Sequence, residues 1–274
     1  MINERNFKQT TLHFVHLKMS TSSEKILVAF DFDHTLVDEN SDIEIIKLCP
    51  GGKVPADLKH QWKKTGWIPY MGAIFEYLHE NSVTESDMKN IIANIPFTPG
   101  MSDLLEYLRN SCFEVIIISD SNSVFINTAL EQKGFKDVVD KVYTNPAHYD
   151  ENGLLKIAFY HFQDWCDLST ENMCKGHILE EHIRQSDSKY RYVLYVGDGI
   201  NDFCPALKLK ETDYVFPREN YSLWEALIKP DEGEGSDKGQ PAVQAQIVNW
   251  SSGLEIREVC KKLCEEKFHE SCNL

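Results

Sequence analysis

No run of apolar residues in this chain is long enough to cross a membrane. A spanning helix needs about 20 consecutive apolar residues, whereas the apolar runs here have the length of β-strands. Residues 1–23 carry His and Lys among their apolar positions and lack the apolar centre of a signal peptide. We therefore expect no membrane partner, and we predict that residues 1–23 form a disordered tail outside the fold.

Positive charge is also scarce. The 274 residues contain 28 Lys and Arg against 43 Asp and Glu, which gives a net charge of −15 and a pI near 5.1. Nucleic acids and anionic membranes attract basic surfaces, so binding to either is not expected. An acidic surface also repels a phosphate-bearing substrate, so local cations must set the potential of any phosphate site.

Disulfide-rich and repetitive architectures are not expected either. The eight cysteines are scattered, and Cys112 and Cys204 flank apolar segments, where free thiols behave as small hydrophobic residues. This usage favours a reducing compartment, and we expect the protein to be cytoplasmic. The chain has no internal repeat, and with 42% hydrophobic residues it can bury a sizeable core.

The most informative residues follow the apolar run 26–30. A continuous run of this length fits a strand buried on both faces of a parallel sheet, and ligands bind at the carboxyl ends of such strands. Asp31 and Asp33 come directly after the run. Two carboxylates that face one small volume repel each other unless a cation or a proton lies between them, and carboxylate oxygens suit Mg²⁺. Taken alone, the pair also fits an ordinary turn or helix cap.

Two later apolar runs are also followed by polar residues at their carboxyl ends. Run 113–118 leads into Ser119, run 192–196 leads to Asp198, and Lys175 opens a helix-like stretch between them. Strands that alternate with helices predict a parallel sheet with helices on both faces. The predicted fold class is therefore α/β, with a doubly wound parallel sheet.

With these motifs in this order, the chain resembles the haloacid dehalogenase superfamily of phosphotransferases. That superfamily carries Asp-x-Asp-x-Thr, a Ser or Thr at a strand end, a Lys, and Gly-Asp-Gly-x-x-Asp. The likeness narrows to the phosphoethanolamine/phosphocholine phosphatase and pyridoxal phosphate phosphatase family over about residues 25–250, on segments 37–42, 96–101, 118–122 and 197–205. The resemblance implies a Rossmann-like core with a small helical cap inserted after the first strand.

The same resemblance implies the catalytic roles. Asp31 would be the nucleophile that forms an aspartyl-phosphate, and Asp33 would be the general acid for the leaving alcohol and then the base for water. Asp31, Asp33 and Asp198 would hold Mg²⁺, with Asp33 contributing its backbone carbonyl. Asp202 would orient this metal shell through hydrogen bonds.

Four further residues would bind the substrate. Ser119 offers a hydroxyl donor and Lys175 a compact positive charge, which suits a phosphoryl group; a turn serine and a solvated lysine are the alternatives. By resemblance, Asp42 and Asp120 bind the polar head group, where two carboxylates favour a cationic amine or the ring polar groups of pyridoxal. Asp42 could instead be a helix N-cap within residues 40–42.

The chain divides into a tail, a core and a cap. These segments are residues 1–23 for the tail, 24–40 and 96–274 for the catalytic α/β core, and 41–95 for the helical cap. Apolar periodicity predicts cap helices at 68–78 and 86–95. The aromatic residues of the cap are expected in its own core, although one or two could line the substrate pocket; they are Trp62, Trp67, Tyr70 and Phe75.

Other elements follow from the same patterns. Helices are expected at 123–133, 175–184 and 253–268, strands at 139–143 and 213–216, a hairpin turn at Gly153, and a mobile loop at 231–239. The group His161, Cys166 and Cys174 resembles a denser His and Cys arrangement of the relatives. In this chain Gln163 and Ser169 replace two positions of that arrangement, and one residue is inserted. Because zinc normally takes four N or S ligands, we expect no structural metal there.

The sequence thus predicts a Mg²⁺-dependent phosphomonoester hydrolase acting on a small phosphorylated metabolite: pyridoxal phosphate, phosphoethanolamine or phosphocholine. A phosphoserine phosphatase-like hydrolase, a phosphotransferase to an alcohol and a catalytically silent phosphate-binding scaffold are the alternatives. The intact motifs argue against silence, and Asp42 and Asp120 would repel the carboxylate of phosphoserine. The sequence does not indicate the oligomeric state.

Overall fold

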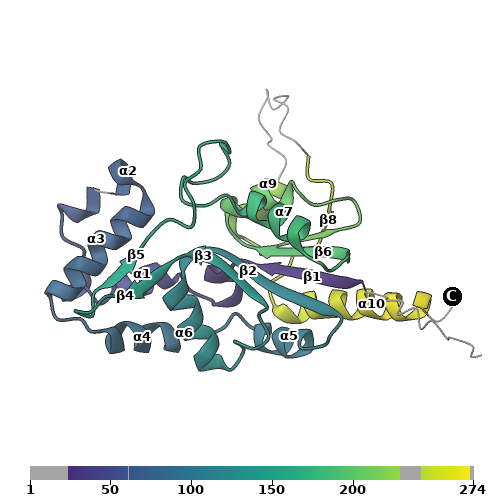
Figure 1. The fold of residues 1–274 in the computed structure, drawn as a ribbon, viewed down its shortest axis with the longest axis horizontal. Helices are drawn as coiled ribbons and strands as arrows, with labels where there is room; N and C mark the ends of the chain where they lie inside the picture. Colours follow the sequence, from purple (N-terminus) through teal and green to yellow (C-terminus); the bar gives the residue numbers. More distant parts are fainter. Residues whose placement is uncertain (1–23, 61, 229–241, 272–274) are drawn as a thin grey trace, which may run out of the picture.

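The computed structural model describes residues 24–60, 62–228 and 242–271 (Figure 1). The predicted tail at 1–23 and the predicted loop at 231–239 lie outside these residues. Among the helices of the described part, none is long and apolar enough to cross a membrane.

A six-stranded sheet forms the centre of the molecule. Its order is β3-β2-β1-β6-β7-β8, and every neighbouring pair is parallel. The strands are β1 (Lys25–Phe30), β2 (Phe113–Asn122), β3 (Lys141–Asn145), β6 (Tyr190–Gly197), β7 (Tyr214–Pro217) and β8 (Gln246–Ile247). The chain steps outward from β1 in one direction through β2 and β3, then returns to β6 on the other side of β1. The predicted doubly wound parallel sheet is confirmed.

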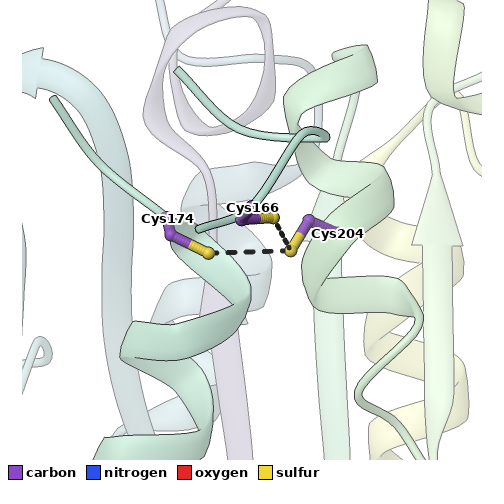
Figure 2. A group of neighbouring side chains, drawn as sticks. All are labelled: Cys166, Cys174 and Cys204. Atoms are coloured by element: carbon purple, nitrogen blue, oxygen red, sulfur yellow. Dashed lines mark hydrogen bonds between the residues drawn. The ribbon is translucent and has the colours of Figure 1, made fainter. Parts of the chain in front are cut away.

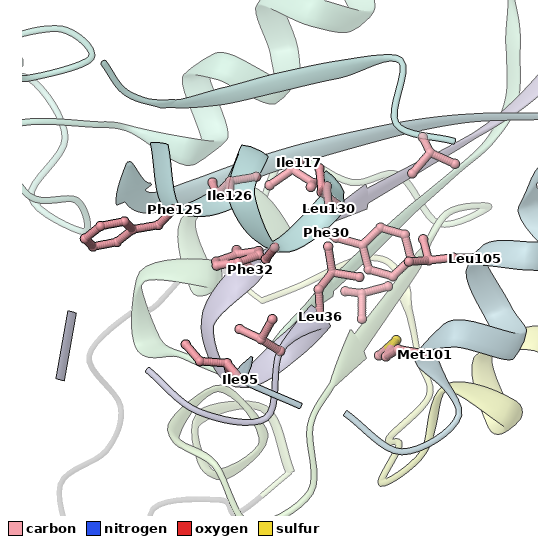
Figure 3. Close-up of a cluster of buried hydrophobic side chains, with 14 of the residues drawn as sticks. Phe30, Phe32, Leu36, Ile95, Met101, Leu105, Ile117, Phe125, Ile126 and Leu130 are labelled. Atoms are coloured by element: carbon pink, nitrogen blue, oxygen red, sulfur yellow. The ribbon is translucent and has the colours of Figure 1, made fainter. Parts of the chain in front are cut away.

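Helices cover both faces of the sheet (Figure 1). On one face lie α5 (Met101–Leu108), α6 (Ser123–Lys133) and α10 (Gly253–Ser271), and on the other lie α7 (Lys175–Gln185), α8 (Phe203–Ala206) and α9 (Ser222–Ile228). Strand β1 shows why two layers form, because successive side chains of a strand point to opposite faces. Phe30 joins one buried cluster (Figure 3), and its neighbour Ala29 joins the other.

The segment between β1 and β2 is mostly helical. It contains α1 (Ser41–Ile46), α2 (Trp62–Thr65), α3 (Trp67–Glu80) and α4 (Glu85–Asn94), with short turns at Phe32–Leu36, Pro50–Gly52 and Leu58–His60. The turn at Phe32–Leu36 is kinked, because Asp33 and His34 have non-helical backbone angles. Helix α4 starts at a capping box between Thr84 and Asp87 and packs along α6. Helix α3 packs against β5, the second strand of a hairpin formed by β4 (Ala147–Tyr149) and β5 (Leu155–Ile157).

Several observed elements differ from the predicted ones, among them β2, β3 and α5. Strand β2 continues past residue 118 to Asn122, because Ser119 and Asn122 still pair with β3. Strand β3 itself begins two residues later than expected, at Lys141. Helix α5 was not predicted, since its eight residues give too short a pattern to separate from the turn before β2.

Helix α10 is anchored to the core by one face. Ile256, Cys260, Leu263 and Cys264 are buried against the cluster that contains Met101 and Leu105 of α5. We expect Ile256→Ala to lower the free energy of unfolding by about 2–5 kcal/mol, measured by urea denaturation followed by circular dichroism. Lys262 is exposed on the same helix, so Lys262→Ala should change it by no more than about 0.5 kcal/mol. Equal effects of the two substitutions would contradict this packing.

Candidate active site

The carboxyl ends of three adjacent strands meet at one pocket. Asp31 follows β1, Ser119 and Asp120 lie near the end of β2, and Asp198 follows β6. The pocket has a volume of about 150 Å³. It is lined by Asp31, Asp33, His34, Asn40, Asp42, Trp67, Ser119, Asp120, Ser121, Asp198, Gly199 and Asn201. The structure therefore brings all but two of the predicted site residues to the pocket wall, and the other two, Lys175 and Asp202, lie directly behind it.

Lys175 is the buried cation of the site. Its Nζ lies 2.7 Å from Asp31 Oδ2 and 2.8 Å from Asp202 Oδ1, and the side chain is 1% exposed. Burial alone would lower the pKa of Lys175, but Asp202 and Asp31 raise it above its ordinary value. Lys175 is thus charged, although it is the first residue of α7, where the helix dipole disfavours a cation. The solvated-lysine alternative is wrong.

Asp202 holds the loop after β6 in shape. Its Oδ2 accepts hydrogen bonds from the backbone N–H groups of Asp198 (3.1 Å) and Gly199 (3.0 Å), and its Oδ1 accepts from Tyr195 Oη at 2.7 Å. A Cβ atom on Gly197 would lie 2.4 Å from Asp202 Oδ2, so position 197 must be glycine for this loop to close. The carboxylate is fully buried and fixes the backbone that carries Asp198.

Three carboxylates meet beside a single lysine. Oxygen atoms of Asp31, Asp198 and Asp202 lie within 4.8 Å of one another. Burial, followed by the charges of Asp31 and Asp202, raises the pKa of Asp198 to about 8. Burial likewise raises the pKa of Asp202 to about 6, against the charge of Lys175. This excess of buried negative charge, with only oxygen donors, fits a hard divalent cation such as Mg²⁺.

The Asp33 carboxylate faces away from this group. Its Oδ1 accepts from the Ser41 backbone N–H at 2.8 Å and its Oδ2 accepts from Ser41 Oγ at 3.1 Å. Burial, followed by the charges of Asp42 and Asp31, raises the pKa of Asp33 well above its ordinary value, although the Ser41 bonds oppose the shift. Asp33 is therefore a carboxyl group that can hold a proton and is fixed in orientation.

Asp42 is buried at the pocket wall with one oxygen unused. Its Oδ2 accepts from Trp67 Nε1 at 2.6 Å, while its Oδ1 has no hydrogen-bond partner among the described residues. Burial raises the pKa of Asp42 to about 6. The N-cap of α1 is Asn40, whose Oδ1 accepts from the Ile43 N–H at 3.0 Å. The N-cap alternative for Asp42 is therefore wrong.

The aromatic residues of the segment divide between two roles. Tyr70 and Phe75 are buried in the core cluster, whereas Trp67 reaches the pocket through its bond to Asp42. The side chain of Trp62 lies outside the described part of the structure. One aromatic residue of the four thus meets the expectation of a pocket contact.

Asp120 is held by two amide side chains. Asn172 Nδ2 donates to its Oδ1 at 3.0 Å and Asn201 Nδ2 donates to its Oδ2 at 2.8 Å. Ser119 is buried beside it, and its Oγ accepts from the Ser121 N–H at 3.2 Å. The carboxylate of Asp120 is therefore fixed in the pocket by neutral donors that leave its charge in place.

Sequence reasoning missed the residues that orient the predicted ones. Ser41, which holds Asp33, and Asn172, which holds Asp120, lie eight and 52 positions away from their partners. No local pattern joins positions 52 apart, and although Ser41 lies within segment 37–42, nothing in that segment marks it as the partner of Asp33. Asn201 and Thr35 were findable, since both lie inside the quoted motifs; Thr35 Oγ1 donates to Asp198 Oδ1 at 3.2 Å.

The fold is similar to that of solved phosphatases. A phosphoserine phosphatase complex with bound substrate matches with a TM-score of 0.54 at 17% identity, over 87% of this chain and 98% of that chain. Cytosolic 5'-nucleotidase IIIB bound to cytidine matches with a TM-score of 0.53 at 13% identity, over 90% of this chain and 88% of that one. At these identities the likeness concerns the fold alone, and it agrees with the predicted Rossmann-like core.

Sequence comparison identifies the family. The chain is 41% identical over 247 residues to pyridoxal phosphate phosphatase PHOSPHO2 of Bos taurus, covering 88% of this chain and 100% of that protein. It is 34% identical over 238 residues to phosphoethanolamine/phosphocholine phosphatase of Homo sapiens, covering 85% and 87%. The model of the family described as Putative Phosphatase matches residues 26–264. The chain therefore belongs to this family and is a phosphatase.

Proposed function

We propose that this phosphatase is a Mg²⁺-dependent phosphomonoester hydrolase that acts on small phosphorylated metabolites with a nitrogen-bearing head group: pyridoxal phosphate, phosphoethanolamine or phosphocholine. The observation that carries this proposal is Asp42, a buried carboxylate on the pocket wall whose Oδ1 has no partner among the described residues. A buried unpaired carboxylate oxygen is costly unless a ligand supplies a donor or a positive charge.

Asp31 is the proposed nucleophile. Its Oδ1 accepts from the Phe32 N–H at 2.6 Å and its Oδ2 contacts Lys175, so the carboxylate is fixed at the strand end. Attack by one of its oxygens on phosphorus would form an aspartyl-phosphate and release the alcohol of the substrate. Ser119 and Lys175 would hold the phosphoryl oxygens by a hydroxyl donor and a positive charge.

Asp31, Asp198 and the backbone carbonyl of Asp33 are the proposed holders of Mg²⁺. When bound, Mg²⁺ would neutralise charge on the phosphoryl oxygens. The excess of buried carboxylates around Lys175 supports this assignment. Asp202 already uses both oxygens on Lys175, Tyr195 and the backbone, so its proposed role is to position Asp198.

Asp33 is the proposed general acid. Burial raises the pKa of Asp33, which favours the protonated carboxyl group that a general acid needs to give a proton to the leaving oxygen. After the alcohol leaves, the carboxylate can take a proton from the water that hydrolyses the aspartyl-phosphate. Ser41 keeps the group in place for both steps.

Asp42 and Asp120 are the residues proposed to bind the head group of the substrate. The ammonium of ethanolamine or a protonated pyridine nitrogen could donate a hydrogen bond to Asp42 Oδ1, whereas the quaternary nitrogen of choline offers charge without a donor. Phosphoserine fits less well, because its carboxylate would face these acids and no Lys or Arg is found among the described residues that line the pocket.

Residues 41–95 are the proposed cap. Trp67 of α3 reaches the pocket from this segment, and the pocket of about 150 Å³ has room for a head group rather than for a folded protein. Such a cover would exclude water from the phosphoryl group. This supports a metabolite substrate over a phosphoprotein.

The proposal is tested by phosphate release with Mg²⁺ from phosphoethanolamine, phosphocholine, pyridoxal phosphate, phosphoserine and pyrophosphate. We expect turnover of at least one of the first three, and a loss of at least ~10³-fold in kcat for Asp31→Asn, which removes the nucleophile. Asp187→Asn is the matched control, because Asp187 is exposed at the opposite end of β6.

Two results would count against the proposal. Inactivity on the whole panel by a folded, Mg²⁺-binding protein would favour a silent phosphate-binding scaffold. Preference for phosphoserine would favour the phosphoserine phosphatase alternative.

Asp198→Asn should weaken Mg²⁺ binding more than it slows the chemical step. Removing one of the proposed ligands should raise the Mg²⁺ concentration for half-maximal activity at least ~10-fold, and excess Mg²⁺ should restore part of the activity. Titration of activity with Mg²⁺ measures this. An unchanged Mg²⁺ requirement would remove Asp198 from the metal site.

Asp42→Asn should change selectivity. We expect kcat/KM for phosphoethanolamine or pyridoxal phosphate to fall by about 10- to 150-fold. This corresponds to the loss of one hydrogen bond to a charged group, about 1.5–3 kcal/mol. The fall for phosphocholine should be smaller. Phosphoserine is the internal control, since loss of a negative charge should leave its hydrolysis unchanged or improved. A uniform fall across all four substrates would show that Asp42 does not read the head group.

A further inference from the structure

Three cysteines from separate segments converge next to the phosphate site (Figure 2). Cys166 lies in the loop between β5 and α7, Cys174 is the N-cap of α7, and Cys204 lies in α8. The Sγ atoms of Cys166 and Cys204 are 3.6 Å apart, those of Cys174 and Cys204 are 3.8 Å apart, and all three lie within 4.8 Å of one another. Cys204 was not part of the group His161, Cys166 and Cys174, for which no structural metal was expected from the sequence, and its position beside Cys166 and Cys174 changes that expectation.

The three thiols form hydrogen bonds through Cys204, and their sulfur separations are also those of thiolates that share one metal ion. Zinc binds sulfur at about 2.3 Å in tetrahedral sites, which places two sulfur ligands about 3.8 Å apart. A disulfide would instead bring two sulfurs to about 2.05 Å, and it would leave the third cysteine without a role. The observed separations of 3.6 and 3.8 Å fit coordination of one ion and are too long for a disulfide.

The backbone near the three cysteines allows their sulfur atoms to lie close together. A Cβ atom on Gly176 would lie 2.6 Å from Cys204 Sγ, so the first turn of α7 can sit against Cys204 only because residue 176 is glycine. Gln163 is buried and donates from Nε2 to the carbonyls of Cys166, Ser169 and Thr170. It thereby holds the loop that presents Cys166.

The fourth side of the group is polar. Ser169 Oγ lies 3.4 Å from Cys166 Sγ. His161 is not available, since its Nε2 accepts from the Cys174 N–H at 3.0 Å. A tetrahedral ion bound by three sulfurs would therefore take Ser169 or a water as its fourth ligand.

We propose that Cys166, Cys174 and Cys204 bind a thiolate-preferring divalent cation, Zn²⁺, with Ser169 or a water in the fourth position. Binding displaces the three thiol protons and involves no change of oxidation state. The ion joins the loop of Cys166 to α7 and α8 directly beside Lys175 and Asp202. Its role is structural: it fixes the two elements that carry the buried ion pair of the active site.

Cobalt distinguishes this site from the carboxylate site. The full-length protein is freed of metal with a chelator under reducing conditions and titrated with Co²⁺, and its absorption is followed. Thiolate ligands give a sulfur-to-cobalt charge-transfer band that oxygen ligands do not, so the Asp31 site is silent in this readout. We expect the band to saturate at one equivalent of Co²⁺ and to be displaced by Zn²⁺.

Five variants sharpen the test. Cys166→Ser, at a half-buried position, and Cys204→Ala should abolish the band, while Cys49→Ala, a buried cysteine outside the group, should keep it. Asp31→Asn should also keep it, which separates this site from the proposed catalytic metal. Ser169→Cys adds a fourth thiolate and should tighten Zn²⁺ binding at least ~10-fold.

Other results would overturn the proposal. Absence of the band in the folded, reduced wild-type protein would do so, as would a band that survives in Cys166→Ser and Cys204→Ala. The unreduced protein should titrate as eight free thiols after denaturation in chelator, the number in the chain. Two fewer, with the missing thiols mapped to this group, would replace the metal site with a disulfide.

Discussion

The active-site end of this molecule depends on the balance between buried carboxylates and one buried lysine. Asp31, Asp198 and Asp202 share a small volume in which repulsion between like charges is poorly screened. Lys175 offsets part of that repulsion by contacts with two of the three. Burial first, and the charge of Asp31 after it, still raise the pKa values of Asp198 and Asp202. The same imbalance that makes the apo site costly is what would draw in a divalent cation and, with it, a phosphoryl group.

The fold can hold this charge because the sheet is parallel. Parallel pairing of β1 with β2 and β6 brings three carboxyl ends to one edge, and helices on both faces bury the strands up to that edge. The opposing positive charge, on Lys175, lies in the helical layer, at the first turn of α7. Its position is fixed only by how α7 packs against α8 and the sheet, so the placement of Lys175 is a tertiary property. Packing at Gly176 and Cys204 therefore bears directly on the electrostatics of the site.

The sequence predicts the parts of the site that local pattern encodes. The strands around Asp31 and Asp198 are short apolar runs with polar ends, and helix α6 was predicted at its observed bounds, 123–133, because Asn122 caps it and Gly134 ends it. Contacts between distant segments carry no such signal. Ser41 on Asp33, Asn172 on Asp120 and Cys204 beside Cys174 all depend on chain packing. The role of Asp42 also depends on chain packing. The sequence allows either Asp42 or Asn40 to cap α1, and only the structure shows that Asn40 is the cap.

The acids of the pocket form two groups with different counter-charges. The inner group lies around Lys175, which offsets part of its negative charge, and the proposed metal ion would offset the rest. The outer group, Asp42 and Asp120, has only neutral donors: Trp67 for one, Asn172 and Asn201 for the other. Neutral donors orient a carboxylate without cancelling its charge, so the field at the mouth of the pocket stays negative. This negative field repels the phosphate of an approaching substrate. A positively charged head group on the same substrate offsets that repulsion. The proposed head-group site would therefore couple selectivity to catalysis, because the charge of Asp42 also raises the pKa of Asp33.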